Sequence, residues 1–330
     1  MNGEIYTPYG FRDRAFQEAR KRRTLLETLF QTFLKRGYQE IITPMVEYLN
    51  VYGEERGSLA LSDMYKFVDR DGELLVLRPD LTPAAARFAT TYLTEESLPC
   101  RISLSGSVFR YSGPFSGKER EVMQSGVELI GLDSPEADAE VLMLGAEALS
   151  ASGLREYKIA VGYTGLSEDI LGLVPGESLK TFVDRKNFPA LKQKLSQRHL
   201  LDTLSKLVEL LTRTEGKELL RKASDLIAKL PEEGPPNKTA AIEAIRQAVE
   251  RMSAVQDILD EAGFGDRIVY DLGMAADLQY YTGVIFQAFT PGSGEYILDG
   301  GRYNELYRQF GKDWTAIGFG IQVDTLMEVV

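Results

Sequence analysis

The chain has 330 residues, of which 44% are hydrophobic and 26% are charged, a balance typical of one large or two ordinary globular domains. No apolar run approaches the roughly eighteen residues of a membrane span and the N-terminus lacks a secretory signal, so we expect a cytoplasmic protein. The formal net charge of −11 argues against nucleic acid as the main partner, because phosphate binding needs clustered cations.

Residues 13 to 36 are predicted to form a long amphipathic helix. Its apolar residues recur at three- and four-residue spacing, at Leu25, Leu26, Leu29, Phe30 and Phe33. Gly37 is the expected stop of this helix. The basic run from Arg20 to Arg23 is interpreted as a solvated helix face, because such faces are common on surface helices.

The next segments contain prolines at informative positions. YQEIITPMVEY, residues 38 to 48, predicts a strand, and Pro44 places it at an edge or an interface because proline has no N–H for the ladder. ELLVLRPDLTPAAARF, residues 73 to 88, predicts a strand, a turn and then a helix that begins near Thr82, since proline suits the first helical turn. Without further context, Asp80 in this turn is typical of a turn or cap residue.

Two strands with one buried face are predicted around residue 115. In CRISLSGSVF, residues 100 to 109, apolar and polar residues alternate as in antiparallel strands. In EVMQSGVELIG, Gln124 and Glu128 share one face about 13 Å apart, because alternate side chains point the same way and each residue adds about 3.3 Å. Gly126 between them either leaves room for a ligand or marks tight packing or a bulge.

The chain has one cysteine, Cys100, and one histidine. A single cysteine excludes an intramolecular disulfide and fits a reducing compartment. Too few histidine and cysteine side chains remain for the usual metal sites, so we expect no metal and no cofactor.

After residue 133 the predicted elements change in character. A helix is expected at 134 to 153, and a strand follows it. Residues 176 to 262 are mainly helical, with glycine and proline punctuation, and this pattern indicates a helical insertion in an otherwise antiparallel sheet domain. Strands are predicted again in RIVYDLG, QYYTGVIFQAF and EYILDGG, followed by a helix in RYNELYRQF, a strand in AIGFGIQ and a helix in VDTLMEVV.

Six segments in order resemble the core of class II aminoacyl-tRNA synthetases of the histidyl type. The general signatures are the long helix with GYQEIITPMVE, then VFRYSGPFSGKEREVMQSGVELIG, and AIGFGIQVDTLM. LRPDLT, LQYYTG and DGGRYNEL resemble segments that line the amino-acid pocket in that family. The resemblance implies an α+β fold in which an antiparallel sheet is flanked by helices. The core is expected at residues 1–175 and 263–330, with the helical insertion at 176–262.

The chain departs from the synthetase pattern where ATP is bound. Arg110 matches the family's arginine, but the glutamate two residues later is Ser112 here, and Gly113 and Thr325 stand where the family has arginines. Ala276 occupies the place of a further arginine in the histidine-specific segment. Removal of one cationic donor for the transition state typically lowers the rate about a hundred- to a thousandfold, so we expect amino-acid activation to be lost. Asp324 is expected to add a negative charge beside the vacated position.

The amino-acid pocket departs less from the family. By resemblance, a histidine-binding site is expected to comprise Asp80, Thr82, Arg110, Gln124, Glu128, Tyr280 and Tyr281. A zwitterion with an imidazole needs carboxylates for its ammonium group, polar partners for the ring nitrogens and a flat aromatic surface. Read without the family context, the paired tyrosines on a strand are packing residues, because aromatic residues favour strands.

These features together resemble the regulatory subunits of ATP phosphoribosyltransferase. The family implies a non-catalytic partner of the short-form catalytic subunit, required for the first step of histidine biosynthesis and for feedback inhibition by L-histidine. It also implies a dimer of this chain within a hetero-octamer. The sequence reaches Val330 without the anticodon-binding domain of the synthetases, so we expect neither that domain nor tRNA binding.

Two other hypotheses remain at this stage. A stand-alone amino-acid-activating ligase would exchange pyrophosphate into ATP and would need the arginines that this chain lacks. A module that binds tRNA without charging it would need a basic face and would bind RNA in a salt-dependent way.

Overall fold

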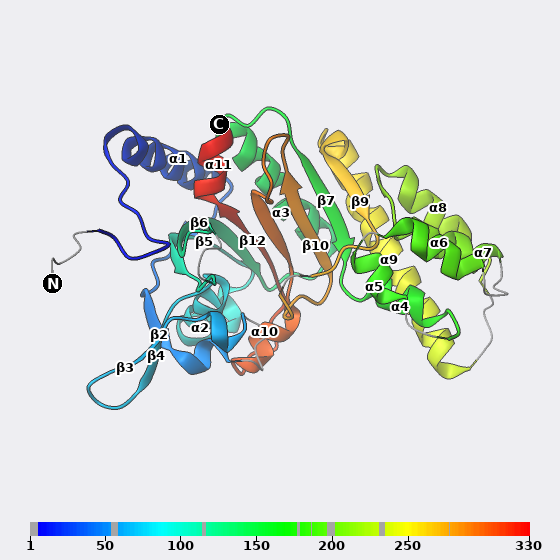
Figure 1. Ribbon diagram of the computed structural model, residues 1–330, viewed down its shortest axis with the longest axis horizontal. Coiled ribbons are helices and arrows are strands. Elements are labelled where there is room, and N and C mark those ends of the chain that lie inside the picture. The colour runs from blue at the N-terminus through cyan, green and yellow to red at the C-terminus, as the bar shows by residue number, and fades with distance from the viewer. Residues whose placement is uncertain are drawn as a thin grey trace.

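The computed structural model of the chain describes residues 6–53, 59–113, 117–176, 179–185, 187–196, 202–230, 235–276 and 278–330 (Figure 1). No helix in these ranges is long and apolar enough to cross a bilayer. Within them, nine strands form one sheet in the order β1 (Gln39–Glu40), β5 (Cys100–Phe109), β6 (Glu121–Ile130), β12 (Ala316–Gln322), β11 (Leu298–Arg302), β10 (Val284–Phe289), β7 (Lys158–Tyr163), β9 (Ile268–Asp271) and β8 (Thr214–Glu215). A small sheet has the order β2 (Val46–Tyr48), β4 (Leu74–Leu77) and β3 (Lys66–Val68).

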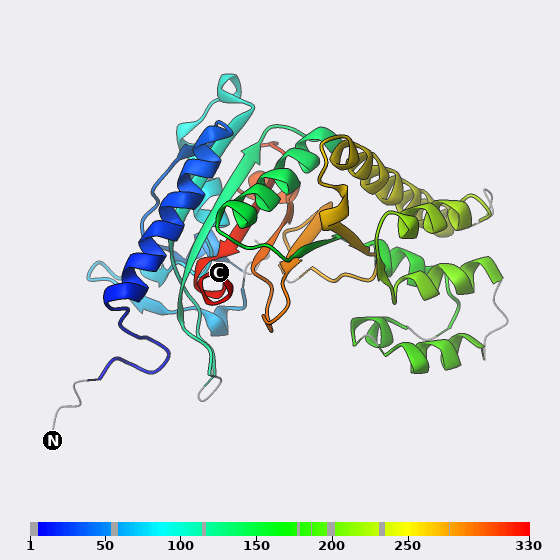
Figure 2. The ribbon, with the colours of Figure 1, turned by 90° about the horizontal axis from the view of Figure 1, so that it is seen from above.

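Helices cover both faces of the large sheet. In the described residues they are α1 (Phe16–Lys35), α2 (Thr82–Tyr92), α3 (Pro135–Ala151), α4 (Leu166–Gly172), α5 (Lys180–Asp184), α6 (Phe188–Ser196), α7 (Asp202–Leu210), α8 (Glu218–Ile227), α9 (Pro236–Glu261), α10 (Asn304–Gln309) and α11 (Val323–Val329). Figure 2 shows α1, α3 and α9 along one face. Against the other face, α2 and α10 enclose a second apolar cluster that includes Ala85, Leu104 and Leu306. The α+β fold expected from the sequence is confirmed.

The helix α1 forms as its apolar spacing predicts. Leu25, Leu29 and Phe33 are buried in the same cluster as the apolar residues of α3, and Gly37 ends the segment with φ of +85°, where a residue with a Cβ would be strained. Arg20, Lys21 and Arg23 are exposed, as expected for a solvated helix face. The Lys21 ammonium donates to the carbonyl oxygens of Met327 and Val330, each at 2.7 Å, so this run holds the C-terminal residues against α1.

Residues 38 to 48 do not form the single strand that the sequence predicts. They divide into β1, which pairs with β5, and β2, which pairs with β4 in the small sheet. The five residues between them carry Pro44, and the backbone N–H of Arg78 donates to the Met45 carbonyl there. The expectation of an edge position is confirmed for β2, which has one strand neighbour.

The large sheet is mixed rather than purely antiparallel. Most neighbouring strands are antiparallel, including β5 with β6 and β6 with β12, but β1 pairs with β5 and β7 pairs with β9 in parallel. Each parallel pair is joined through a long stretch of chain that contains helices. Two parallel strands need a long connection, because the chain must return to the same end of the sheet before the second strand begins. The residue pattern of a single strand therefore does not show whether its partner is parallel.

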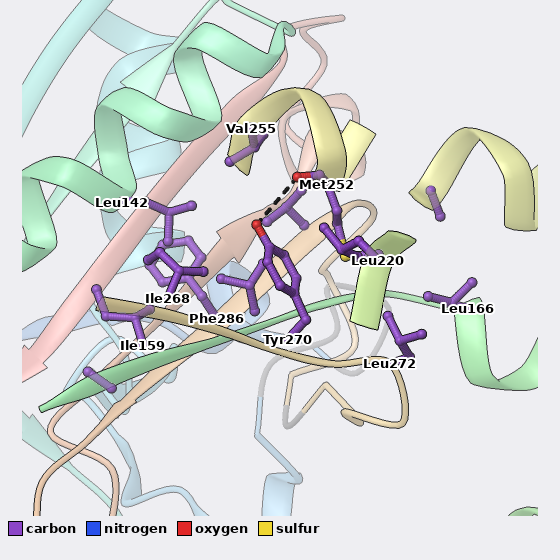
Figure 3. Close-up of a cluster of buried hydrophobic side chains, with 14 of the residues drawn as sticks. Leu142, Ile159, Leu166, Leu220, Met252, Val255, Ile268, Tyr270, Leu272 and Phe286 are labelled. Atoms are coloured by element: carbon purple, nitrogen blue, oxygen red, sulfur yellow. Dashed lines mark hydrogen bonds between the residues drawn. The ribbon is translucent and has the colours of Figure 1, made fainter. Parts of the chain in front are cut away.

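The region between 176 and 262 is helical where it is described; residues 177–178, 186, 197–201 and 231–234 lie outside the described part. Its helices share one apolar core with the sheet. Figure 3 shows Tyr270 and Leu272 beside Met252 of α9 and Leu220 of α8, and the Tyr270 hydroxyl donates to the Met252 carbonyl at 3.4 Å. The division of the chain into a core and an insertion therefore stays a prediction.

A buried ion-pair cluster joins α3, α9 and β11. The Asp138 side chain on α3 is fully buried. Its carboxylate accepts from Arg251 Nε of α9 and from Arg302 Nη2 of β11, both at 2.6 Å. Asp133 contacts the same two arginines from a position where its side chain is 41% exposed. Asp138 thus fixes the long helix and the centre of the sheet to α3.

Candidate functional site

One small cavity lies between β6, β11, β12 and the start of α2. All seven residues of the expected site line this cavity: Asp80, Thr82, Arg110, Gln124, Glu128, Tyr280 and Tyr281. Its volume is about 30 Å³, the space of one or two water molecules. An amino acid could therefore enter only if some of the lining side chains moved.

Asp80 stands in the turn between β4 and α2. Its carboxylate accepts a hydrogen bond from the Tyr280 hydroxyl at 3.0 Å and from the Thr82 backbone N–H at 3.4 Å. The Tyr52 hydroxyl donates to the Asp80 carbonyl oxygen at 2.8 Å. Asp80 is thus both a turn residue, as its position suggests, and a wall of the cavity, while the N-cap position of α2 is Leu81.

The turn is anchored by two arginines. Buried Arg78 donates through Nε to the Ser107 carbonyl oxygen at 2.9 Å and through Nη1 to the Thr43 carbonyl oxygen at 2.8 Å. Arg110 Nε donates to the Pro79 carbonyl oxygen at 2.8 Å, and Arg110 also lines the cavity. These bonds fix the backbone directly before Asp80 against the neighbouring strands.

Glu128 is the most deeply buried charged group of the cavity, with 3% of its surface exposed. Burial raises the pKa of the Glu128 carboxyl well above its usual range, while a hydrogen bond with the Thr82 side chain opposes this shift. Its Oε2 finds no hydrogen-bond partner among the described residues. A buried carboxyl oxygen without a donor is costly to keep and is typical of a binding or catalytic position.

The paired tyrosines form one wall. They lie in the turn before β10 and not on a strand as the sequence suggested, because pairing with β7 and β11 begins only beyond Gly283. Their ring centroids are 5.0 Å apart, and the Tyr281 ring packs over Gly301, where a Cβ would collide with it. Burial, and to a smaller extent neighbouring carboxylates such as Asp299 and Asp80, raise the pKa of the Tyr281 hydroxyl well above its usual range.

Asp299 is a cavity residue that sequence reasoning missed. It stands in the predicted strand EYILDGG, and the structure places it on β11 opposite Gly320 of β12. The available signal was an acidic residue directly after the apolar run of EYILDGG. Tyr303 and Leu278 also line the cavity and were likewise not selected.

The positions that depart from the synthetase pattern lie elsewhere. Ser112, Gly113, Ala276 and Thr325 are outside the cavity lining. The negative charge expected at Asp324 has partners: the carboxylate accepts from the Met123 backbone N–H at 2.8 Å and contacts Arg14 at 3.2 Å and Arg22 at 3.4 Å. In the described part of the chain, no group of three or more His, Cys, Asp or Glu side chains is arranged to hold a metal ion.

The role of Gly126 is decided by packing. A Cβ at this position would collide with the Phe319 carbonyl oxygen of β12, so the close approach of two strands requires the glycine. We expect Gly126→Ala to lower the free energy of unfolding by about 1–3 kcal/mol. Gly320→Ala is the matched control on the neighbouring strand, because its Cβ would meet no atom within 4 Å. Equal denaturant midpoints for the two variants would contradict this explanation.

Comparison with known proteins places these features in a family. The family model described as histidyl-tRNA synthetase matches residues 10–326. The chain is 35% identical to the ATP phosphoribosyltransferase regulatory subunit of Acetivibrio thermocellus, over 98% of this chain and 76% of that protein. It is also 35% identical to the regulatory subunit of Clostridium acetobutylicum, over 99% of this chain and 79% of that protein.

Solved structures agree with this result. A Bacillus halodurans protein described as an ATP phosphoribosyltransferase regulatory subunit/histidyl-tRNA synthetase superposes with a TM-score of 0.85 at 28% identity, covering 99% of this chain and 83% of that one. A histidine–tRNA ligase subunit from Alicyclobacillus acidocaldarius gives a TM-score of 0.80 at 27% identity, covering 100% and 98%.

Proposed function

The chain belongs to the histidyl-tRNA synthetase family and, within it, to the ATP phosphoribosyltransferase regulatory subunits, and from this premise we propose how it acts. It is the non-catalytic partner of a short-form ATP phosphoribosyltransferase, a glycosyltransferase. The catalytic subunit needs it for activity in the first step of histidine biosynthesis, and L-histidine inhibits the enzyme through it.

The proposal for the effector site rests on one observation: seven side chains from separate parts of the sequence line the same cavity. Two carboxyl groups, Asp80 and Glu128, face an amide at Gln124 and an aromatic wall. The ammonium group and ring nitrogens of histidine are the donors that such a set accepts. Glu128 Oε2, buried without a donor, is the atom with most to gain from the ligand.

Inhibition follows from linkage between this cavity and the catalytic subunit. Since the cavity of about 30 Å³ is too small for histidine, the bound form differs from the one described. If histidine binds the inhibited arrangement tenfold more tightly, the coupling is about 1.4 kcal/mol. The proposal includes loss of aminoacylation, no tRNA binding, and dimers of this chain within a cytoplasmic hetero-octamer.

The test is reconstitution. We expect the full chain to co-elute with a short-form catalytic subunit from the same source, to raise its turnover, and to make that turnover sensitive to histidine. A catalytic subunit that is fully active alone and unaffected by this chain would contradict the proposal. Histidine-dependent exchange of pyrophosphate into ATP by the chain alone would instead support a ligase.

A further inference from the structure

Three polar side chains beside the cavity are joined in a string by hydrogen bonds. Gln124 Nε2 on β6 donates to Gln322 Oε1 on β12 at 3.4 Å, and Gln322 Nε2 donates to Asp299 Oδ1 on β11 at 3.3 Å. Gln124 and Gln322 are only 5% and 9% exposed, so water has little access to either amide. Gln124 and Asp299 line the cavity, whereas Gln322 is not among its lining residues.

The sheet register brings these three side chains together. Gln124 and Gln322 are paired residues of adjacent antiparallel strands, and Asp299 is paired with Gly320, two residues before Gln322. Alternate residues of a strand point to the same face, so Gly320 and Gln322 share one face of β12. The string therefore crosses three strands.

The carboxylate gives the string a direction. An ionised carboxylate only accepts hydrogen bonds, whereas each amide has one accepting and one donating end. With its NH2 group toward Asp299, Gln322 turns its oxygen toward Gln124, and Gln124 must turn its own NH2 group toward that oxygen. Gln124 Oε1 is then the end that faces away from Gln322.

We propose that Asp299 is a positioning residue that acts through Gln322 to fix the amide of Gln124 with its oxygen toward the ligand. This inference rests on the proposed histidine site and adds to it. The cavity then offers acceptors at both Gln124 Oε1 and Glu128 Oε2, four residues apart on one face of β6. It selects a ligand that brings an N–H donor to each, as the ammonium group and the imidazole N–H of histidine do.

The test moves the carboxylate along the string. In Asp299→Asn the last residue can donate as well as accept, so the direction of both amides is no longer fixed. In the double variant Asp299→Asn with Gln322→Glu, the carboxylate stands at the middle position, where it accepts from Gln124 again. Total charge is the same in the double variant and the wild type.

Binding is measured by calorimetry on the full chain, alone and with the catalytic subunit, for three ligands. They are histidine, β-(pyrazol-1-yl)alanine, whose ring has no N–H, and imidazolelactate, which has no ammonium group. One of the two analogues lacks the N–H that Gln124 Oε1 accepts in the wild type. We expect Asp299→Asn to reduce the discrimination against that analogue about tenfold, because the freed Gln124 amide can now donate to it. Discrimination against the other analogue is expected to stay unchanged. The double variant is expected to regain the discrimination, and thermal unfolding checks that each variant is folded.

Equal weakening of all three ligands in Asp299→Asn, or a double variant that does not recover, would overturn the role of Asp299. In either case histidine binding by the wild type would leave the proposed function standing. If the wild-type chain binds no histidine, either alone or with the catalytic subunit, both the role of Asp299 and the proposed function are overturned.

Discussion

Replacing Asp138 by alanine is expected to lower the free energy of unfolding by about 3–5 kcal/mol, because the change leaves buried cations without their counterion. Arg302 is almost fully buried, with 4% of its side chain exposed, and it donates to Asp138 through Nε at 3.0 Å and Nη2 at 2.6 Å. Arg251 reaches the same carboxylate from α9. Loss of Asp138 therefore weakens the attachment of α9 and β11 to α3.

Asp133→Ala is the matched control for this variant. Asp133 contacts Arg251 at 2.9 Å, but 41% of its side chain is exposed, so water and salt screen the pair. We expect a loss of less than about 1 kcal/mol. Urea unfolding followed by circular dichroism measures both. Comparable losses would mean that the exposed carboxylate contributes as much as the buried one, which would contradict the role given to burial.

Glu128→Gln is expected to have opposite effects on stability and on ligand binding. The raised pKa of the Glu128 carboxyl means that the folded state binds a proton more tightly than the unfolded state does. The stability contributed by this group is fully present below the unfolded pKa of about 4.3 and is lost as pH rises through the folded pKa. A glutamine has no proton to lose, so the variant gains relative to the wild type across this window.

Each pH unit within the window is expected to shift the difference in unfolding free energy by about 1.4 kcal/mol in favour of the variant. Denaturant midpoints measured between pH 4 and pH 8 give this slope. Glu121→Gln, at a half-buried position of the same strand outside the cavity lining, is the matched control substitution. Parallel pH profiles for wild type and Glu128→Gln would show that Glu128 is not held in its protonated form.

Histidine affinity is expected to fall about tenfold to a hundredfold in Glu128→Gln, because a hydrogen bond to a charged group typically contributes about 1.5–3 kcal/mol. Calorimetry on the full chain measures it. An unchanged affinity would place the effector outside this cavity. A more stable protein that binds its effector less well is the expected consequence of a site that keeps a buried carboxyl for its ligand.

Local sequence patterns predicted most elements because their cause is local. The apolar spacing of α1 and the helix expected at 134 to 153 each reflect a single element, and the structure has both. The strands β5 and β6 also form, but burial along them does not alternate, because clusters of apolar residues pack on both faces of the sheet. The pattern was wrong for residues 38 to 48, where one expected strand contributes to two sheets. Which partner a strand pairs with depends on distant residues, so the pattern of the strand itself could not show it.

The composition of the cavity was predictable for a different reason. The ordered motifs include most of its polar residues, and β6 presents Gln124 and Glu128 on the same face. Gln322 was not selected because nothing in its own segment distinguishes it. Asp299 was not selected although it is an acidic residue directly after an apolar run. Their importance comes from hydrogen bonds across strand boundaries, which join residues 23 and 198 positions apart.

The sequence by itself determined the types of most elements, because these follow from spacing and residue chemistry. The fold class and the seven expected site residues came from its resemblance to a known family. Only the tertiary structure decided the electrostatic surroundings of individual charged side chains. It buried Glu128, gave Asp324 two arginine partners and placed Asp138 between Arg251 and Arg302. The free energy of a charge depends on every atom within a few ångströms of it, and those atoms come from distant parts of the chain.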